Sequence, residues 1–278
     1  MRQLLPILLP MLLALLAAPV LAQSMTISGR PIPGGLLIIG IPPGDGGLKL
    51  DGIPIPAAEP GRFLVGIPRD AVGTMTLKSF GGLETKVVLE PRSYRIQRLP
   101  ALGVTDAPAP QWVQRREREV AVMRSGKWSA AAAPAASVGW KQAFAIPAVG
   151  RETGVYGSQR VYGGLPRSPH TGLDIAARIG TPVKAPAAGI VRVATGPFLL
   201  EGNVVLLDHG AGLVTSYLHL DSISVRPGDK VARGAVIGSI GNTGRSTGPH
   251  LHWGMSLVRP APGGGFDEVR LDPKLMLK

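Results

Sequence analysis

Residues 247–258 read TGPHLHWGMSLV, a turn of glycine and proline followed by a run of mainly apolar residues. A run of this kind between turn signals is typical of a β-strand. Side chains two residues apart on a strand point to the same face, so His250 and His252 would project side by side while Leu251 and Trp253 pack behind them. The stretch therefore predicts a strand with one packed face and one face that carries two histidines.

Further β-type runs lie upstream of this strand, from Trp140 onward. They read VKAPAAGIVRVAT, NVVLLDHG, GLVTSYLHL, ISVRPGDKV and AVIGSIG, and Gly and Pro turns separate them. The pattern predicts no helix of any length in this region. Residues 140–278 are therefore expected to form an all-β domain, and their number lies within the usual range for one domain.

Residues 23–100 show a second set of short apolar runs. GLLIIGI, GLKLDGIPI, GRFLVGI, TMTLKSF, ETKVVLE and SYRIQRL each look like one strand, and breakers such as AAEPG (57–61) stand between them. Several short strands at this spacing predict a small β-sandwich. The region contains no histidine and its acidic residues are scattered, so no chemistry is predicted for it.

Residues 101–139 are predicted to be a linker with one helix. The segment begins in a Pro/Ala-rich stretch, and residues 111–124 (QWVQRREREVAVMR) then read as the helix. Its apolar residues could share one side while the charged residues alternate in sign on the other. These apolar residues are Trp112, Val113, Val120 and Met123. The Ala-rich stretch from Ser129 to Ser137 is predicted to be a loop.

The first 22 residues predict a secretory signal peptide. An apolar run from Leu4 to Leu21 ends in the small-residue pattern Val20-Leu21-Ala22, so the mature chain would begin at Gln23. A retained membrane anchor is the alternative, but the run is close to the lower limit for a membrane span and prolines interrupt it. We therefore expect export, and no stable membrane span after cleavage.

The composition narrows the possible chemistry and partners. The chain has no cysteine, which excludes disulfides, a thiol nucleophile and a cysteine-ligated metal. Lys and Arg number 30 against 18 acidic residues, a net charge of +12. This charge suits an anionic polymer or a membrane surface, with simple solubility as the alternative. Nucleic acid is disfavoured by the signal peptide and by the lack of a basic stretch interleaved with aromatic residues.

All the histidines of the chain lie in the C-terminal region. They are His170, His209, His219, His250 and His252. Asp174 follows His170 at an offset of four in PHTGLD (169–174), which spans about 13 Å when extended. Two ligands of one ion cannot lie that far apart, so the chain must bend between them, and Gly172 permits the bend. His219, in SYLHL, lies on a strand that could face the same groove.

Two imidazoles and one carboxylate, without a thiolate, match an open catalytic zinc site. Zinc in such a site acidifies a bound water and polarises a carbonyl. Only three of the candidate side chains are needed as ligands, and the remaining histidines can act as bases or stabilise an oxyanion. The alternative is a strand that merely exposes two histidines. The chain has neither the HExxH motif of thermolysin-like zinc sites nor the GxSxG motif of serine hydrolases.

The chain from Tyr156 to Val258 resembles the lysostaphin-type zinc metallopeptidases, which cleave peptide cross-links in peptidoglycan. YGSQR, HTGLDIAA, GTPVKAPAAGIV, NVVLLDHGAGLVTSYLHL and VRPGDKVARGAVIGSIGNTGRSTGPHLHW carry the resemblance in this order. It implies a β-sheet groove open to solvent and one Zn²⁺ per chain. The implied zinc ligands are His170, Asp174 and His252, and the implied catalytic pair is His219 and His250.

The resemblance has further implications. Arg160 matches a recurrent arginine with a substrate or a structural role, and His209 matches a frequent turn residue with a structural role. The front region is similar, more loosely, to a small β-domain that precedes this peptidase in some exported Gram-negative proteins. We therefore expect a zinc-dependent D,D-endopeptidase that acts on the stem peptides of peptidoglycan.

Some relatives within this family have lost zinc ligands and instead activate cell-wall amidases by binding them. This sequence retains all three implied ligands and both implied catalytic histidines. An active enzyme is therefore favoured, and a non-catalytic regulator of amidases is the alternative.

Overall fold

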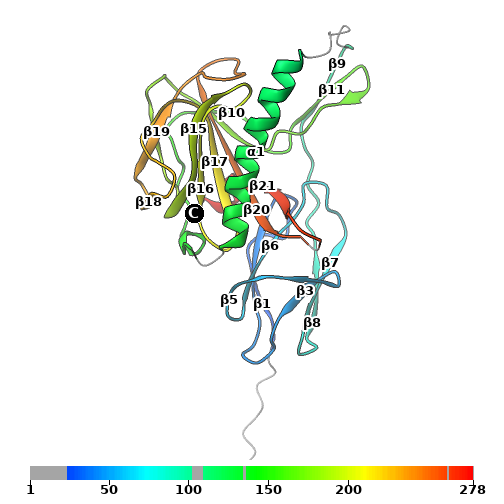
Figure 1. Cartoon of the computed structure of the whole chain (residues 1–278). Helices are drawn as coiled ribbons and strands as arrows, with labels where there is room; N and C mark the ends of the chain where they lie inside the picture. Colours follow the sequence, from blue (N-terminus) through cyan, green and yellow to red (C-terminus); the bar gives the residue numbers. More distant parts are fainter. Residues whose placement is uncertain (1–23, 102–108, 134–135, 262, 278) are drawn as a thin grey trace, which may run out of the picture.

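The computed structural model describes residues 24–101, 109–133, 136–261 and 263–277. Two β-rich parts lie end to end, and the long helix α1 (Pro110–Ala132) runs along the larger one (Figure 1). The predicted fold class, two β-domains with one intervening helix, is confirmed. Among the residues described, no helix combines the length and the apolar composition needed to cross a membrane. The predicted signal peptide lies outside the described residues.

The front part is a sandwich of two four-stranded antiparallel sheets, as the sequence predicts. One sheet has the order β1 (Thr26–Ser28), β2 (Leu36–Gly40), β6 (Arg62–Gly66) and β5 (Ala57–Glu59). The other has the order β4 (Ile53–Ile55), β3 (Leu48–Leu50), β7 (Thr74–Ser79) and β8 (Glu84–Val88). The core between them contains the fully buried side chains of Leu37, Ile39, Val65 and Leu77.

Two predictions for the front part are wrong in detail. GLKLDGIPI is a hairpin rather than one strand, because Asp51 and Gly52 both adopt positive φ angles, 48° and 85°. An Asp-Gly pair with positive φ at both positions is a favoured two-residue hairpin turn. The predicted breaker at residues 57–61 contains the short edge strand β5, which pairs with β6 through a register shift.

The strand predicted in SYRIQRL also lies elsewhere than in the sandwich. It is β9 (Ile96–Leu99), which runs parallel to β11 (Gln159–Tyr162) in a three-stranded sheet completed by β12 (Leu165–Pro166). The end of the front part is thus hydrogen-bonded to the segment that precedes His170. Sequence patterns do not reveal this pairing because the two strands are far apart in the chain.

A ten-stranded sheet forms the larger part. Its main order is β10 (Arg151–Gly154), β13 (Gly172–Ala176), β20 (His250–Pro260), β17 (Leu213–Ile223), β16 (Gly202–Asp208), β15 (Gly189–Phe198) and β18 (Lys230–Val231). Also attached are β14 (Pro182–Lys184), β19 (Val236–Ile240) and β21 (Phe266–Leu271). The only helices in the described part of this region are the 3-10 turns Gly139–Lys141 and Pro273–Met276. The expected all-β character of the C-terminal region is confirmed.

The two faces of β20 have different surroundings. Leu251 and Trp253 are fully buried in the largest core cluster. Val258 lies on the opposite face and packs in a second cluster that contains residues of α1. Because side chains alternate along a strand, His250 and His252 share the face of Val258. Helix α1 therefore covers one end of this face, and the histidines lie toward the other.

Helix α1 is longer than predicted and buries a different face. Ser129–Ala132 belong to the helix, so the predicted loop is wrong at its start. Trp112, Val113 and Val120 are exposed, whereas the sequence placed them on a shared apolar side. The residues that α1 buries are Glu119, Gly126, Lys127, Ala130 and Ala131.

Small side chains and ion pairs explain the buried face of α1. Gly126 allows a close approach to the sheet, since a Cβ there would lie 2.5 Å from Cγ2 of Val193. Lys127 can be buried because its Nζ lies 2.6 Å from Oε1 of Glu268. The helix packs through close backbone approach and charge pairing. The spacing of apolar residues in the sequence does not predict either of these.

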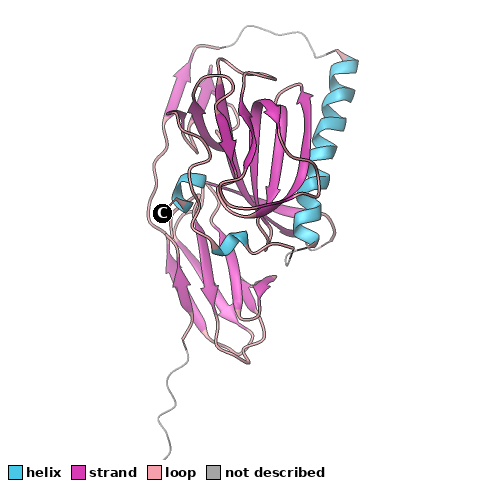
Figure 2. Cartoon of the chain, turned by 90° about the vertical axis from the view of Figure 1, so that its left-hand side faces the viewer, coloured by secondary structure: helices cyan, strands magenta, loops and turns pink. Residues whose placement is uncertain are grey.

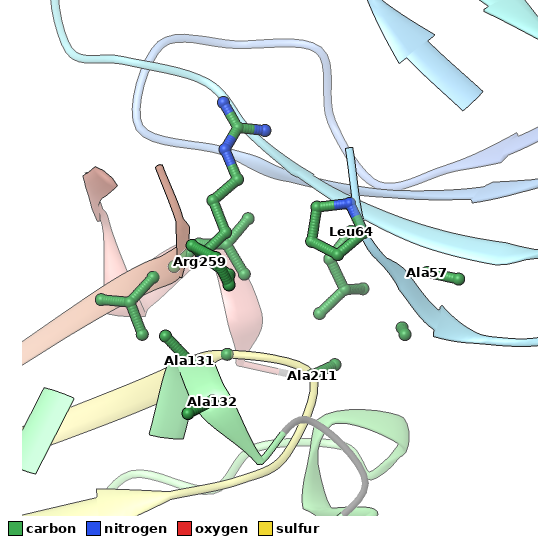
Figure 3. Close-up of a pocket in the computed structure, with 12 residues that line it drawn as sticks. Ala57, Leu64, Ala131, Ala132, Ala211 and Arg259 are labelled. Carbon is green, nitrogen blue, oxygen red and sulfur yellow. The ribbon is translucent and has the colours of Figure 1, made fainter. Parts of the chain in front are cut away.

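The front part packs against the base of the large sheet (Figure 2). Leu36 and Leu64 of the front sheet belong to the same core cluster as Leu257 of β20. A pocket of about 200 Å³ lies at this joint, and Figure 3 shows its mainly aliphatic lining. The labelled residues are Ala57, Leu64, Ala131, Ala132, Ala211 and Arg259. The two parts thus share apolar packing in addition to the pairing of β9 with β11.

Candidate metal centre

Two neighbouring strands bring the two histidine-containing stretches together. Strands β13 and β20 are antiparallel, and Asp174 lies directly opposite His252 in their register. Directly opposed residues project to the same face of a sheet. His170 lies just before β13 and reaches the same face. Residues far apart in the sequence thus form one site.

The distances within this site are short. Asp174 Oδ1 lies 3.0 Å from His170 Nε2 and 2.9 Å from His252 Nδ1. The two histidine nitrogens are 3.0 Å apart. The three residues form a group that could hold a metal ion. Their side chains keep between 11% and 23% of their surface exposed, so the site can be reached from solvent.

The donor set fits a cation. The Nδ1 of His170 lies 3.1 Å from the Val155 carbonyl oxygen, a hydrogen bond that would leave Nε2 as an electron-pair donor. Nε2 then faces the Asp174 carboxylate and a nitrogen of His252. Two ring nitrogens and one carboxylate oxygen thus lie within about 3 Å of one another. Deprotonated imidazole and carboxylate groups are the donors that a divalent metal requires.

Two glycines leave space for the side chains of this candidate metal site. A Cβ at Gly154 would lie 2.1 Å from Oδ2 of Asp174, and one at Gly172 would lie 2.9 Å from Nε2 of His252. The predicted bend at Gly172 is wrong, because this residue begins the regular strand β13. Gly172 is needed for its missing side chain instead, because a Cβ there would also lie 2.3 Å from the Trp253 carbonyl oxygen.

The other two predicted histidines stand beside this group. The rings of His219 and His250 have centroids 4.8 Å apart, and Nε2 of His250 lies 3.9 Å from Asp174 Oδ1. Nδ1 of His219 donates to the Thr243 carbonyl at 2.9 Å, and Nδ1 of His250 donates to the Gly248 carbonyl at 2.8 Å. These bonds assign the proton of each neutral ring to Nδ1 and leave Nε2 able to accept a proton.

The position of His219 depends on a break in strand β17. Strict alternation would place it on the core face with Tyr217, but Tyr217 and Leu220 are both in the core. His219 has a φ of +64°, and β17 exchanges its partner β20 for β19 at this point. A non-glycine residue in this conformation costs energy and is often found at functional sites. The irregularity turns His219 toward the face that carries Asp174 and His252.

Burial and hydrogen bonds set the charges of the site. Burial alone would raise the pKa of Asp174, but hydrogen bonds with His170 and His252 outweigh it and hold that pKa well below its usual range. Burial lowers the pKa of His219 and of His252. For His170, burial also lowers the pKa, but the bond to Asp174 prevails and the net shift is upward. His219 is therefore neutral at pH 7 and suited to accept a proton.

Helix α1 supports His219 indirectly. The backbone N–H of His219 donates to the carbonyl of Glu201 at 2.8 Å. The Glu201 carboxylate receives two bonds from Arg116, at 2.6 and 2.7 Å, and the Leu199 N–H donates to Glu119. The sequence showed only that the charged residues of this helix alternate in sign. Its positioning role could have been found only by knowing which loop lies beside it.

His209 and Arg160 lie apart from the ligating group. His209 is fully buried in the turn after β16, with Nδ1 2.8 Å from the Ala188 carbonyl oxygen and Nε2 2.7 Å from Thr215 Oγ1. These contacts accord with the structural role implied for it. Arg160 is exposed on β11, and its backbone carbonyl accepts a bond from Arg167.

The burial of His209 predicts a loss of stability in acid. Burial lowers the pKa of His209 to about 4, against about 6.5 in an unfolded chain. The unfolded state therefore binds the extra proton first, and the stability contribution is lost as pH falls from about 6.5 toward 4. At pH 4.5 this loss amounts to about 2 to 3 kcal/mol. Urea denaturation of metal-free protein at pH 7.5 and 4.5 measures it.

The matched variant for this measurement is His209→Gln. It should be less stable than the wild type at pH 7.5, because buried partners lose hydrogen bonds. Its further loss between pH 7.5 and 4.5 should be smaller by about 2 to 3 kcal/mol. An equal acid-induced loss in both proteins would show that His209 does not titrate in this way.

Known proteins share this site region. Residues 168–262 match the model of peptidase family M23. Over 95 residues the chain is 50% identical to the peptidoglycan DD-endopeptidase ShyA of Vibrio cholerae. This match covers 34% of this chain and 22% of that protein. Over 86 residues it is 48% identical to the DD-carboxypeptidase/endopeptidase Mpg of Neisseria meningitidis. That match covers 30% of this chain and 19% of the relative. The match thus spans about a fifth of the length of these relatives.

A solved structure extends the similarity beyond the site. The crystal structure of a Pseudomonas aeruginosa protein described as a peptidase M23 matches with a TM-score of 0.59 and 28% identity. The match covers 89% of this chain and 95% of that one, so it includes the front part as well as the large sheet. Together with the family match, these findings identify residues 168–262 as a domain of peptidase family M23, the lysostaphin-type family that the motifs resemble.

Proposed function

We propose that the chain is a zinc-dependent endopeptidase that hydrolyses the peptide cross-links of peptidoglycan. The main observation behind the proposal is the convergence of His170, Asp174 and His252 within about 3 Å, with His219 and His250 beside them. The names of the relatives ShyA and Mpg support the substrate class and favour a D,D-endopeptidase. We propose the same bond specificity for this chain.

His170, Asp174 and His252 would hold one Zn²⁺ per chain. Two imidazoles and one carboxylate are a usual ligand set of catalytic zinc, which leaves a position open for reacting groups. When bound there, zinc would acidify water and polarise the scissile carbonyl. The hydrogen bond from His170 Nδ1 to Val155 would fix which nitrogen faces the metal, as outer partners of metal-bound histidines commonly do.

His219 and His250 would supply the proton transfer and the charge stabilisation. Their Nδ1 protons are engaged by backbone carbonyls, so Nε2 of each neutral ring can accept a proton from the attacking water. Once protonated, such a ring can stabilise the negative charge that develops on the carbonyl oxygen or donate to the leaving amine. The two rings are close enough to act on one substrate.

The proposal extends to domain roles and location. Residues 1–22 would direct export to the periplasm and be removed. Residues 23–100 would form the front domain, 101–139 the connection with its helix, and 140–278 the peptidase domain. The net charge of +12 would attract the anionic stem peptides of the wall.

Digestion of purified cross-linked peptidoglycan tests the proposal. The zinc-loaded protein, without any amidase, should release fragments whose masses correspond to cleaved cross-link peptides, and a chelator should stop their release. The masses also identify the bond that is cut. If no fragment forms and the protein instead stimulates an added amidase, the chain is a regulator and the proposed function is wrong.

A further inference from the structure

His170 is the one candidate metal ligand of the described chain that lies outside a strand, so another segment must orient it. Residues 155–158 provide its contacts. The His170 N–H donates to the Ser158 carbonyl, and the Gly157 N–H donates to the His170 carbonyl, each at 2.8 Å. The ring Nδ1 bonds the Val155 carbonyl. Backbone and ring of His170 are therefore both fixed by this short segment between β10 and β11.

The front part holds the same segment. Arg69, in the loop after β6, donates to the Gly157 carbonyl from Nε at 3.0 Å and from Nη2 at 2.7 Å. Its guanidinium carbon lies 4.4 Å from the centroid of the Tyr94 ring, and only 15% of the side chain is exposed. The guanidinium group thus directs two donors at one carbonyl while it stacks on an aromatic ring. This stacking holds the group in place for the two hydrogen bonds.

The packing leaves no room for a side chain at Gly157. Its φ is +81°, and a Cβ there would lie 2.1 Å from the Tyr94 ring. Tyr94 in turn packs edge-on against Tyr156, with centroids 6.2 Å apart. The segment that orients His170 is thus clamped between Arg69 and Tyr94 of the front part.

The side-chain ion pairs between the two parts end elsewhere. Arg92 bonds the carboxylate of Asp272, and Lys141 bonds that of Glu59. None of these four residues appears among the hydrogen-bond partners of His170. Arg69 differs because its acceptor, Gly157, is itself bonded to the backbone of His170. The Arg69 contact is therefore directed at the site and is not only a link between two parts.

We propose that Arg69 is a positioning residue for the metal centre: by holding Gly157 it fixes the segment that orients His170, so that the front part completes the metal site. This inference rests on the metal role proposed above for His170. It assigns the front part a function in building the site.

Zinc affinity tests this proposal without recourse to hydrolysis. Competition with a chromophoric chelator gives the dissociation constant of the full-length wild type, Arg69→Ala and Arg69→Lys. Loss of groups that orient metal ligands commonly weakens metal binding about 10- to 100-fold. Because Arg69 acts through Gly157, we expect about 10-fold for Arg69→Ala, and an intermediate value for Arg69→Lys, which has one donor group. The visible spectrum of bound Co²⁺ should also shift in Arg69→Ala.

Leu64→Ala is the matched control, since it loosens the apolar contact between the two parts away from residues 155–158. It should lower the thermal midpoint yet bind zinc within about twofold of the wild type, because the His170 contacts remain. Wild-type zinc affinity and an unchanged Co²⁺ spectrum in both Arg69 variants would overturn the proposal. An equal weakening by Leu64→Ala would also overturn it, since docking alone would then matter. A wild type that binds no zinc would refute the metal centre itself.

Discussion

Replacing His219 or His250 by alanine should abolish the hydrolysis of cross-link peptides and leave the metal bound. Neither side chain belongs to the ligating group of His170, Asp174 and His252. Both rings present an Nε2 that can exchange protons with the reacting groups. Loss of a positioned acid–base group typically costs about 10²- to 10⁴-fold in rate. We expect a decrease of this size in kcat/KM for each variant.

The measurement compares the wild type and both variants on purified peptidoglycan, with metal content determined on the same samples. Full metal content combined with loss of cleavage is the expected result. His209→Gln serves as a control, because it removes a buried histidine that contacts Ala188 and Thr215 instead of the site. Cleavage at the wild-type rate by either alanine variant would remove that histidine from the mechanism.

His252→Ala should reduce the bound zinc from one per chain to background. His252 is the most buried of the three proposed ligands, and its Nδ1 lies within 3.0 Å of His170 Nε2 and of Asp174 Oδ1. Without it, only two protein ligands remain where catalytic zinc usually has three. Hydrolysis should be lost together with the metal, in contrast to the His219 and His250 variants.

Thermal unfolding provides a second readout for this variant. A ligand that binds only the folded state stabilises it by about 2.7 kcal/mol at a concentration 100 times its dissociation constant. Zinc should therefore raise the thermal midpoint of the wild type and leave that of His252→Ala nearly unchanged. Stoichiometric zinc in purified His252→Ala would show that other residues hold the metal.

The sequence was sufficient to predict the local part of the site. The alternation in HLHW placed His250 and His252 on one face and buried Leu251 and Trp253, as the structure shows. Alternation is a local property of a strand, so it can be read without knowing the partner strands. The pairing of Asp174 with His252 needed the register between β13 and β20, which only the family resemblance suggested.

Features that depend on distant contacts could not be predicted. The bulge that turns His219 toward the site arises where β17 changes partner, and SYLHL gives no sign of it. The buried face of α1 follows from the approach of Gly126 to the sheet and from the pairing of Lys127 with Glu268. Arg69 reaches Gly157 across 88 positions of the chain. Each depends on tertiary packing, which overrides local preference.

Anomalous diffraction from crystals of the zinc-loaded protein tests the central claim most directly, because it locates the metal among the side chains. Difference maps from data collected above and below the zinc absorption edge should show one peak per chain, bonded to His170, Asp174 and His252 and present only above the edge. A peak held by other residues, or no peak at this position in zinc-loaded protein, would contradict the account.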